Sequence, residues 1–181
     1  MNAPTEVKIL PADPDVIIAF AALLVSFIAL IFTIFQFYIQ RKHNQNSVRP
    51  IGQIVCGDKQ ETVFVHLANL GLGPMTVTKL SFKTNNGTVH NIEHCLTLNP
   101  RSYFHVTISE DNPQTILPNG HLKLFEQVFN HFGDPNKQQS RSLLCEMEIQ
   151  AEYYDIYNSM YTVKRKLNWF GRYLNEEKHQ D

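Results

Sequence analysis

The sequence predicts an N-terminal single transmembrane α-helix followed by a mainly-β domain, a β-sandwich or a small barrel. The first observation is an unbroken apolar run at residues 16–39, VIIAFAALLVSFIALIFTIFQFYI. The second is a period-two alternation of apolar and polar residues in the chain beyond about residue 50. The third is a series of short turn sequences that divide this part into seven or eight candidate strands, a pattern typical of sandwiches and barrels.

The apolar run at residues 16–39 is long enough to cross a bilayer. About 20 apolar residues span the hydrocarbon core as a helix, and this run contains no charge, proline or glycine. A cleavable signal peptide is the alternative, but it needs a shorter apolar core, a basic leader and a small-x-small exit. The leader here has more acidic than basic residues, and residues 36–40 offer no small pair. We therefore expect a retained anchor.

The charges beside the run predict its orientation. Only Lys8 precedes it, whereas Arg41, Lys42 and Arg49 follow it. Because basic residues near a span tend to remain in the cytoplasm, we expect the N-terminus outside and the C-terminal domain in the cytoplasm. An odd number of cysteines without paired spacing also suits a reducing compartment; they are Cys56, Cys95 and Cys145.

The small and polar residues of the span recur at alternating spacings of three and four, the a/d positions of a heptad. They are Ala19, Ala22, Ser26, Ala29, Thr33, Gln36 and Gln40. Small residues let helices approach closely and polar ones can hydrogen-bond between helices, so this stripe predicts self-association with left-handed crossing. The alternative is that Ala and Ser are simply common in spans and that Gln36 and Gln40 lie at the headgroup level. A further step beyond self-association is that a polar-lined bundle leaks ions.

The β-domain is expected to begin with a short strand after Pro50 and to continue through alternating segments. The expected strands are 51–56, 63–67, 75–83, 88–92, 104–108, 122–128, 145–153 and 161–167. The turn sequences 85–87, 118–120 and 155–158 separate several of them. In the clearest strand, 145–153, apolar residues at odd positions alternate with Glu and Gln, which predicts one buried and one wet face.

Two further segments have no strand pattern. Residues 130–142 are polar and contain Gly133 and Pro135, so they are expected to form a loop. Residues 69–74, Asn-Leu-Gly-Leu-Gly-Pro, lie between two strands. A phosphate cradle needs a helix N-terminus behind the glycines, so we expect a tight connection with glycines at positive φ instead.

The sequence shows no pattern of catalytic residues. It lacks a P-loop, a dinucleotide-binding glycine pattern and a nucleophile elbow. His90 and His94 are expected about 14 Å apart along a strand, and nothing near Cys95 completes a tetrahedral metal set. We therefore predict a protein that is not an enzyme and has no metal and no cofactor.

One basic cluster is a candidate site for an anionic ligand. Lys164, Arg165 and Lys166 adjoin aromatic residues, which would suit a small anion, a nucleotide or acidic lipid headgroups. Residues 44–181 carry 13 Lys and Arg against 14 Asp and Glu, so general nucleic-acid binding is not expected. The alternative interpretation is a solvated strand end.

These patterns divide the chain into five segments. They are an extracytoplasmic tail at 1–15, the transmembrane helix at 16–40, a basic juxtamembrane linker at 41–50, the cytoplasmic β-domain at 51–167 and a C-terminal tail at 168–181.

Three short motifs carry a resemblance: Arg49-Pro50 after the span, the turn at residues 69–74, and Tyr153 to Asp155. In layout and motifs the chain resembles single-span prokaryotic membrane proteins with a cytoplasmic β-domain. It is similar to membrane effectors of antiviral defence systems, either activated by cyclic oligonucleotides or tied to retrons. The resemblance implies a prokaryotic inner membrane location and a β-domain that senses a ligand while the self-associating span perturbs the membrane. The alternative function is a passive tether or assembly factor whose β-domain binds a protein partner.

Overall fold

The computed structural model describes residues 13–85, 87–130 and 134–174. The chain divides into two compact units, Met1–Asn44 and Gln45–Asp181, and each is described by itself. Residues 1–12 of the expected tail at 1–15 and residues 175–181 of the expected tail at 168–181 lie outside the described residues.

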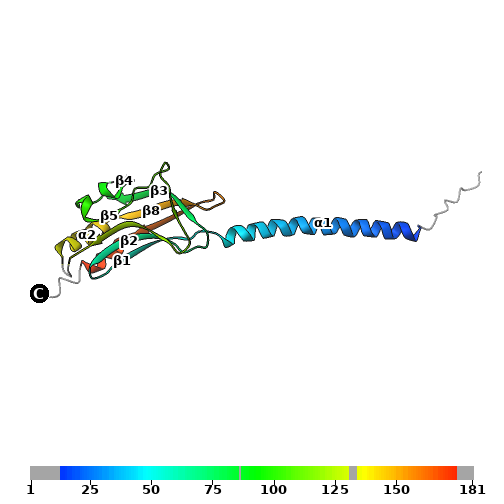
Figure 1. Cartoon of the computed structure of the whole chain (residues 1–181), viewed down its shortest axis with the longest axis horizontal. Coiled ribbons are helices and arrows are strands. Elements are labelled where there is room, and N and C mark those ends of the chain that lie inside the picture. The colour runs from blue at the N-terminus through cyan, green and yellow to red at the C-terminus, as the bar shows by residue number, and fades with distance from the viewer. Residues whose placement is uncertain (1–12, 86, 131–133, 175–181) are drawn as a thin grey trace, which may run out of the picture. The chain divides into compact units, whose positions relative to one another are not determined.

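The first unit contains most of a single long helix, α1 (Pro14–Ser47). Figure 1 shows it as one continuous ribbon. None of its residues is buried, and in the described part of the chain it is the one helix long and apolar enough to cross a membrane. The chain therefore has a single-pass anchor. The helix continues to Ser47, so residues 41–47 of the expected linker are helical.

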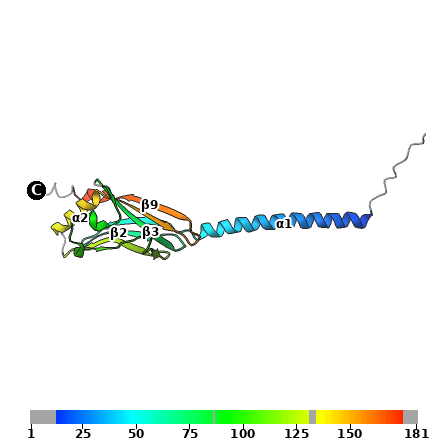
Figure 2. The ribbon, with the colours of Figure 1, turned by 90° about the horizontal axis from the view of Figure 1, so that it is seen from above.

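The second unit is a sandwich of two antiparallel sheets, which confirms the predicted fold class (Figures 1 and 2). The four-stranded sheet A has the order β1 (Gly52–Asp58), β2 (Thr62–Asn69), β7 (His121–Val128) and β5 (Phe104–His105). The five-stranded sheet B has the order β4 (Gly87–Val89), β3 (Met75–Thr84), β8 (Glu148–Tyr154) and β9 (Met160–Lys166), and β6 (Gln114–Ile116) pairs with β3.

The core lies between the inner faces of the two sheets, where alternate residues of each strand are buried. Val63, Val65 and Leu67 of β2 are fully buried, and their neighbours are only half-buried. In β8, Ile149 and Ala151 are fully buried between half-buried polar residues. The predicted register of this strand is therefore confirmed, although it begins at Glu148.

The expected loop at 130–142 is wrong for most of its described part, because Pro135–Cys145 form a helix, α2. In both views α2 lies at one end of the sheets. The Asp134 side chain caps its N-terminus by accepting from the amide of Asn136. Its buried residues include Lys137 and Ser140. Because hydrogen-bonded polar residues such as Lys137 and Ser140 occupy the buried face of α2, the sequence lacks the apolar periodicity that predicts a helix.

Buried charges attach α2 to the sheets. The Asp58 carboxylate lies 3.0 Å from Lys137 Nζ and 2.7 Å from Arg141 Nε, and Asp58 and Lys137 have nearly no exposed side-chain surface. Lys137 also donates to the carbonyls of Lys59 and Gln60. The partners of α2 come from residues about 80 positions earlier, so sequence pattern alone does not reveal them.

Several smaller elements also differ from expectation. The short strand β6 was not predicted. The segment expected as strand 88–92 becomes β4 and the 3₁₀-helix η1 (Ile92–His94), and the 3₁₀-helix η2 (Pro100–Ser102) precedes a two-residue β5. The expected C-terminal tail begins with the 3₁₀-helix η3 (Asn168–Tyr173), whose Phe170 is fully buried. The domain therefore extends beyond residue 167.

Candidate functional site

Three turns and the incoming chain form one end of the sandwich, called the base here. It consists of residues 48–51 and the turns at 70–74, 117–120 and 155–159, because β1, β3, β7 and β9 begin there and β2, β6 and β8 end there. The opposite end, called the far end, carries α2 and η3.

The fully buried side chain of Asn69 connects these segments. Its Oδ1 accepts hydrogen bonds from the amides of Ile51 and Gly71, at 3.3 and 3.0 Å. Its Nδ2 donates to the carbonyls of Gly73 and Ile116, at 2.7 and 3.1 Å. All four hydrogen-bonding positions of the amide are used, so one residue joins the start of β1 to two of the turns.

The glycines of the turn at 70–74 are needed because the backbone approaches closely. A Cβ on Gly71 would lie 2.3 Å from the carbonyl oxygen of Arg49, and one on Gly73 would lie 1.8 Å from that of Val48. Among the described glycines, only Gly87 has a positive φ. The predicted tight connection is present, but positive φ was the wrong reason for it. The turn presses directly on the segment that leaves α1.

The outer face of sheet A carries a stack of rings, called the aromatic–histidine face here. Phe64 and His66 stack with centroids 4.4 Å apart, and His66 and His121 stack at 4.7 Å. Gly57 lies under the Phe64 ring, since a Cβ there would meet the ring at 2.1 Å. Phe104 of the neighbouring β5 is 54% exposed. This face offers exposed aromatic surface beside charged groups.

A β-bulge brings the charges onto that face. The pairing of β2 with β7 shifts between Val65 and His66, and Leu124 and Phe125 are both buried as a result. Lys123 and Glu126 would lie on opposite faces of a regular strand, but here they are 2.5 Å apart. Glu126 Oε2 also lies 3.0 Å from His66 Nε2.

This geometry shifts two pKa values. Burial lowers the pKa of His66 below 6.5, and the nearby His121 and Lys123 lower it further, whereas Glu126 raises it. The hydrogen bond from Lys123 lowers the pKa of Glu126. Near neutral pH the face therefore presents a neutral imidazole beside a carboxylate–ammonium pair.

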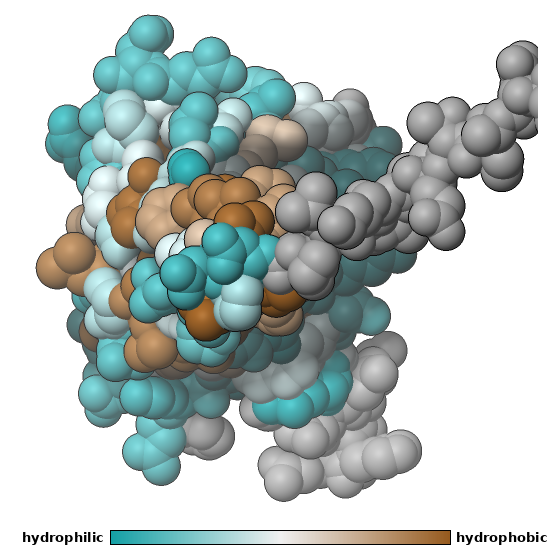
Figure 3. Space-filling model, turned by 90° about the vertical axis from the view of Figure 1, so that its right-hand side faces the viewer, coloured by the Kyte–Doolittle hydropathy of each residue, from teal (hydrophilic) through white to brown (hydrophobic). Residues whose placement is uncertain are grey.

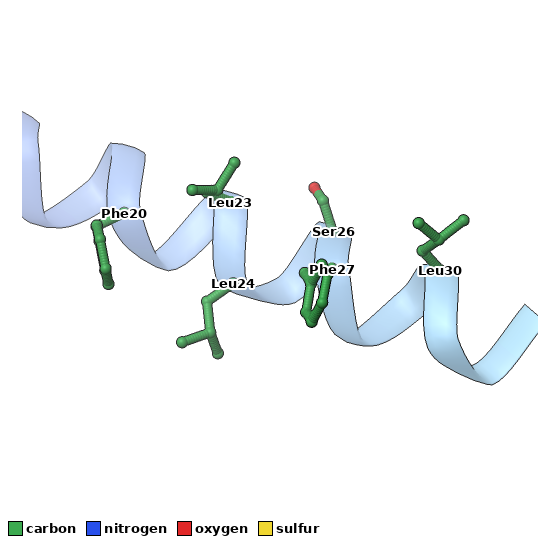
Figure 4. Close-up of a pocket in the computed structure, with 6 residues that line it drawn as sticks. All are labelled: Phe20, Leu23, Leu24, Ser26, Phe27 and Leu30. Atoms are coloured by element: carbon green, nitrogen blue, oxygen red, sulfur yellow. The ribbon is translucent and has the colours of Figure 1, made fainter.

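The predicted self-association stripe lies along α1 with its two hydroxyl groups already bonded. Ser26 Oγ donates to the carbonyl of Ala22 and Thr33 Oγ1 to that of Ala29, both at 2.8 Å. Ser26 borders a groove of about 440 Å³ among bulky side chains, where its hydroxyl points to the same side as Leu23 and Leu30 (Figure 4). Contact between copies along the stripe stays a prediction.

The predicted basic cluster is split between two faces of β9. Lys164 and Lys166 are exposed, whereas Arg165 is half-buried and donates to the carbonyl of Ile54 in β1. Lys166 also lines a mixed-charge pocket of about 250 Å³ with Lys83 and Glu148. Arg165 thus links the edges of the two sheets, and anion binding by the cluster stays a prediction for the two lysines.

The histidines named in the sequence do not gather. His90 Nδ1 lies near the Leu80 carbonyl, and His94 belongs to η1, so the expected shared strand face does not exist. In the part of the chain that the structure describes, no cluster of three or more His, Cys, Asp or Glu could hold a metal. The three cysteines are free thiols, and burial raises the pKa of Cys56 and Cys95.

Sequence reasoning missed two features of these sites. From the sequence, residues 69–74 were predicted only as a tight connection, and the hydrogen bonds of the Asn69 side chain were not foreseen. The motif Asn-x-Gly-x-Gly-Pro was an available signal, because Asn side chains often bond the backbone of a following turn. The aromatic–histidine face was missed because its residues come from three strands, β2, β5 and β7. In addition, the β-bulge in β7 cannot be recognised from the alternation of apolar and polar residues in the sequence.

Comparisons with known proteins give a distant likeness only. No family model matches the chain, and no curated protein matches it. One similar solved structure is the archaellum periplasmic stator protein FlaG from Sulfolobus acidocaldarius, at 12% identity and TM-score 0.25, covering 64% of this chain and 100% of that one. Another is the archaeal flagellum of Methanospirillum hungatei strain JF1, at 11% identity and TM-score 0.31, covering 83% and 88%. We draw no functional argument from TM-scores this low.

Proposed function

We propose that this protein is a membrane tether or assembly factor that holds a protein partner at the membrane through its β-domain. The connection at the base carries the proposal. Only residues 48–51 separate α1 from β1, and the Asn69 side chain, Gly71 and Gly73 hold them against the turn at 70–74. A connection of so few residues keeps the β-domain close to its membrane anchor, as a tether requires.

We assign the partner to the aromatic–histidine face of sheet A. Aromatic residues are enriched in protein interfaces, and Phe104 is exposed beside Lys123, whose ammonium lies 5.8 Å from the ring centroid. The outer face of sheet B is different, since it presents Lys83, Glu148 and Lys166 in one row across three strands. Mixed-charge rows of this kind favour solubility over a stable contact.

The experiment compares the two faces in the full chain. The double variant Phe104→Ala with His121→Ala should abolish recovery of the partner after crosslinking in cells and purification from solubilised membranes. The matched variant Lys164→Ser with Lys166→Ser, on sheet B, should leave recovery unchanged. Both variants alter exposed side chains, so membrane location and circular dichroism should stay the same. Loss of the partner with the lysine variant alone would refute the assigned face.

The same pair of variants tests the alternative, a ligand-responsive effector of antiviral defence. That function requires the lysines to bind an anionic signal such as a cyclic oligonucleotide, and the span to permeabilise the membrane. In that case only the lysine variant would remove toxicity upon induced expression. Toxicity that follows the lysines, with no protein recovered on either face, would replace the tether with the effector.

The orientation and the association of the span belong to the same proposal. The basic residues after the span favour a cytoplasmic β-domain, so alkaline phosphatase fused after Asp181 should be inactive and a fluorescent protein should fluoresce. Single cysteines walked from Ala19 to Gln36 should crosslink between copies with a period of 3.5 residues. An active phosphatase would show that the β-domain lies outside the cytoplasm. A flat crosslinking profile would show that the span does not associate through the stripe.

A further inference from the structure

Exposed apolar side chains concentrate at the base of the sandwich. Among the described residues of the β-domain, nine large hydrophobic side chains are exposed; six of them lie at the base, and a seventh, Met160, follows it as the first residue of β9. The six at the base are Ile51, Leu70, Leu72, Leu117, Ile156 and Tyr157. Phe104 and Val128 are the other two. Figure 3 colours the molecule by hydropathy, with many hydrophilic residues around the margin of the view, and the exposed side chains of the base are identified from their exposed fractions.

The turns at the base are also nearly without charge. The segments 70–74 and 117–120 contain no Asp, Glu, Lys or Arg, and Asp155 is the one such residue in 155–159. Its carboxylate is already used, because it accepts from the amides of Tyr157 and Ser159 at 2.8 Å each and from the Tyr161 hydroxyl. Surface turns are normally built from polar residues and glycine. Leucine at 73% and 67% exposure, in Leu72 and Leu117, is therefore a feature to be explained.

These side chains bury little of their surface in the fold. The clasp below them is formed by backbone groups and the Asn69 amide, and Leu70 and Leu72 alternate with the glycines that make the close approach. Burying one leucine is worth about 1.5–3 kcal/mol, and this gain is not realised while the side chains face water. The apolar surface is available for a contact outside the domain.

The length of α1 identifies what that contact is. Its 34 residues rise about 51 Å at 1.5 Å per residue, whereas a bilayer with its headgroups is about 40–45 Å thick. The helix is thus only slightly longer than the membrane. Residues 48–51 follow α1 directly and belong to the base, so only a few residues of chain separate the base from the helix that spans the membrane. Arg41, Lys42 and Arg49 lie on the same stretch of chain and suit acidic headgroups.

We propose that the base is a membrane-docking surface, in which the leucine-rich turns and Tyr157 insert into the lipid–water interface of the membrane that α1 spans. Tyrosine favours this interface because its ring is apolar and its hydroxyl is polar. Docking lays the domain on the bilayer at a fixed height. The surface acts independently of any partner on sheet A.

The test uses the full chain in nanodiscs that hold one copy each, with the native cysteines replaced by alanine. A fluorophore is attached to a single cysteine at Leu72, Leu117 or Ile156, and the matched control is Val128, which is 68% exposed at the end of β7 far from the base. Lipids with a nitroxide on the headgroup should quench the three base positions severalfold more than Val128.

A second variant separates docking from folding. With Leu72→Glu and Leu117→Glu together, quenching at Ile156 should fall to the level of Val128, while the melting temperature stays unchanged because both leucines are exposed. Equal quenching at all four labelled positions would overturn the proposal. The proposal would also be overturned if Leu72→Glu with Leu117→Glu changed the fluorescence at Ile156 only in discs that hold two or more copies. The base would then be a contact between copies.

Discussion

The two ends of the β-domain are built on opposite principles. At the far end, the buried Asp58 carboxylate pairs with Lys137 and Arg141, and these charges fasten α2 to the sheets. At the base, a neutral amide, Asn69, fills the equivalent structural role with four hydrogen bonds to backbone groups. The far end buries charge, whereas the base exposes leucine.

This difference in how the two ends are held together agrees with the proposal that the base, and not the far end, makes a contact outside the domain. A buried ion pair contributes little net stability, since desolvation offsets most of the attraction, but it is costly to break. A neutral amide avoids the desolvation of a charge, so the turns at 70–74 and 117–120 are fastened without any buried charge. An end held by amide hydrogen bonds and covered with leucine is suited to a bilayer surface, and an end held by ion pairs is suited to water.

The largest effect is expected from Asp58→Ala at the far end. Lys137 would keep only carbonyl partners in a buried site, and removing one member of a buried pair typically costs about 3–5 kcal/mol. Chemical unfolding of the full chain in detergent micelles, followed by circular dichroism, measures the free energy of unfolding. The control Asp111→Ala removes an exposed carboxylate and should have nearly no effect. A loss below about 1 kcal/mol would mean that the carbonyls of Lys59 and Gln60 suffice for Lys137.

A smaller loss is expected from Asn69→Ala at the base. The change leaves two amides and two carbonyls without their partner, and each unsatisfied buried group costs about 1–3 kcal/mol. Water reaches some of them at the half-buried Ile51, so we expect a total of about 2–4 kcal/mol. The same unfolding experiment measures it, with the exposed Asn85→Ala as the control. If the loss exceeds that of Asp58→Ala, the base and not the far end is the stronger closure.

Acidic pH should lower the free energy of unfolding through protonation of Asp155, in the turn at 155–159. Burial raises the pKa of this carboxyl, but hydrogen bonds from the amides of Ser159 and Tyr157 and from the Tyr161 hydroxyl outweigh it, and the folded pKa lies below the ordinary 3.8. The unfolded state then binds more protons at acidic pH, so the stabilisation is present above pH 3.8 and is lost as the pH falls through the folded pKa.

The measurement for Asp155 is the free energy of unfolding as a function of pH. Asp155→Asn retains an oxygen acceptor for the turn and removes the titration, so its curve should be flatter than that of the wild type below about pH 5. Glu126, whose pKa is also lowered, contributes equally to both curves. Parallel curves would show that Asp155 adds nothing to the pH dependence.

The smallest effect on folding is expected from Leu72→Ser. The side chain is 73% exposed, and surface substitutions of this kind change stability by less than about 0.5 kcal/mol. Thermal unfolding in micelles would measure it, with Leu67→Ser, at a fully buried position of β2, as the strongly destabilised counterpart. A large loss from Leu72→Ser would give the exposed leucines a structural role and weaken the contrast between the two ends.

Much of the fold follows from local sequence pattern. The span is determined by an apolar run that only a helix can satisfy in lipid, and the long strands β2, β3, β7, β8 and β9 follow from alternation because one face of each lies on the core. The elements that were not predicted, α2 and β6, or were predicted at the wrong length, β5, all lack a recognisable apolar period within their own residues. Helix α2 buries Lys137 and Ser140 in place of apolar residues, and β5 and β6 are two and three residues long, too short to show a period.

The candidate sites depend more on tertiary structure. By itself the sequence determined the membrane anchor, the β-domain and the register of β8, because hydrophobic burial acts at a fixed period along the chain. Only the tertiary structure decided that Asn69 closes the base, that Arg165 bonds β1 and is separated from Lys164 and Lys166, and that exposed apolar side chains from three separate turns share one end. Hydrogen-bond partners and surface neighbours are set by which strands pair, and that pairing joins residues too far apart for any local pattern to record.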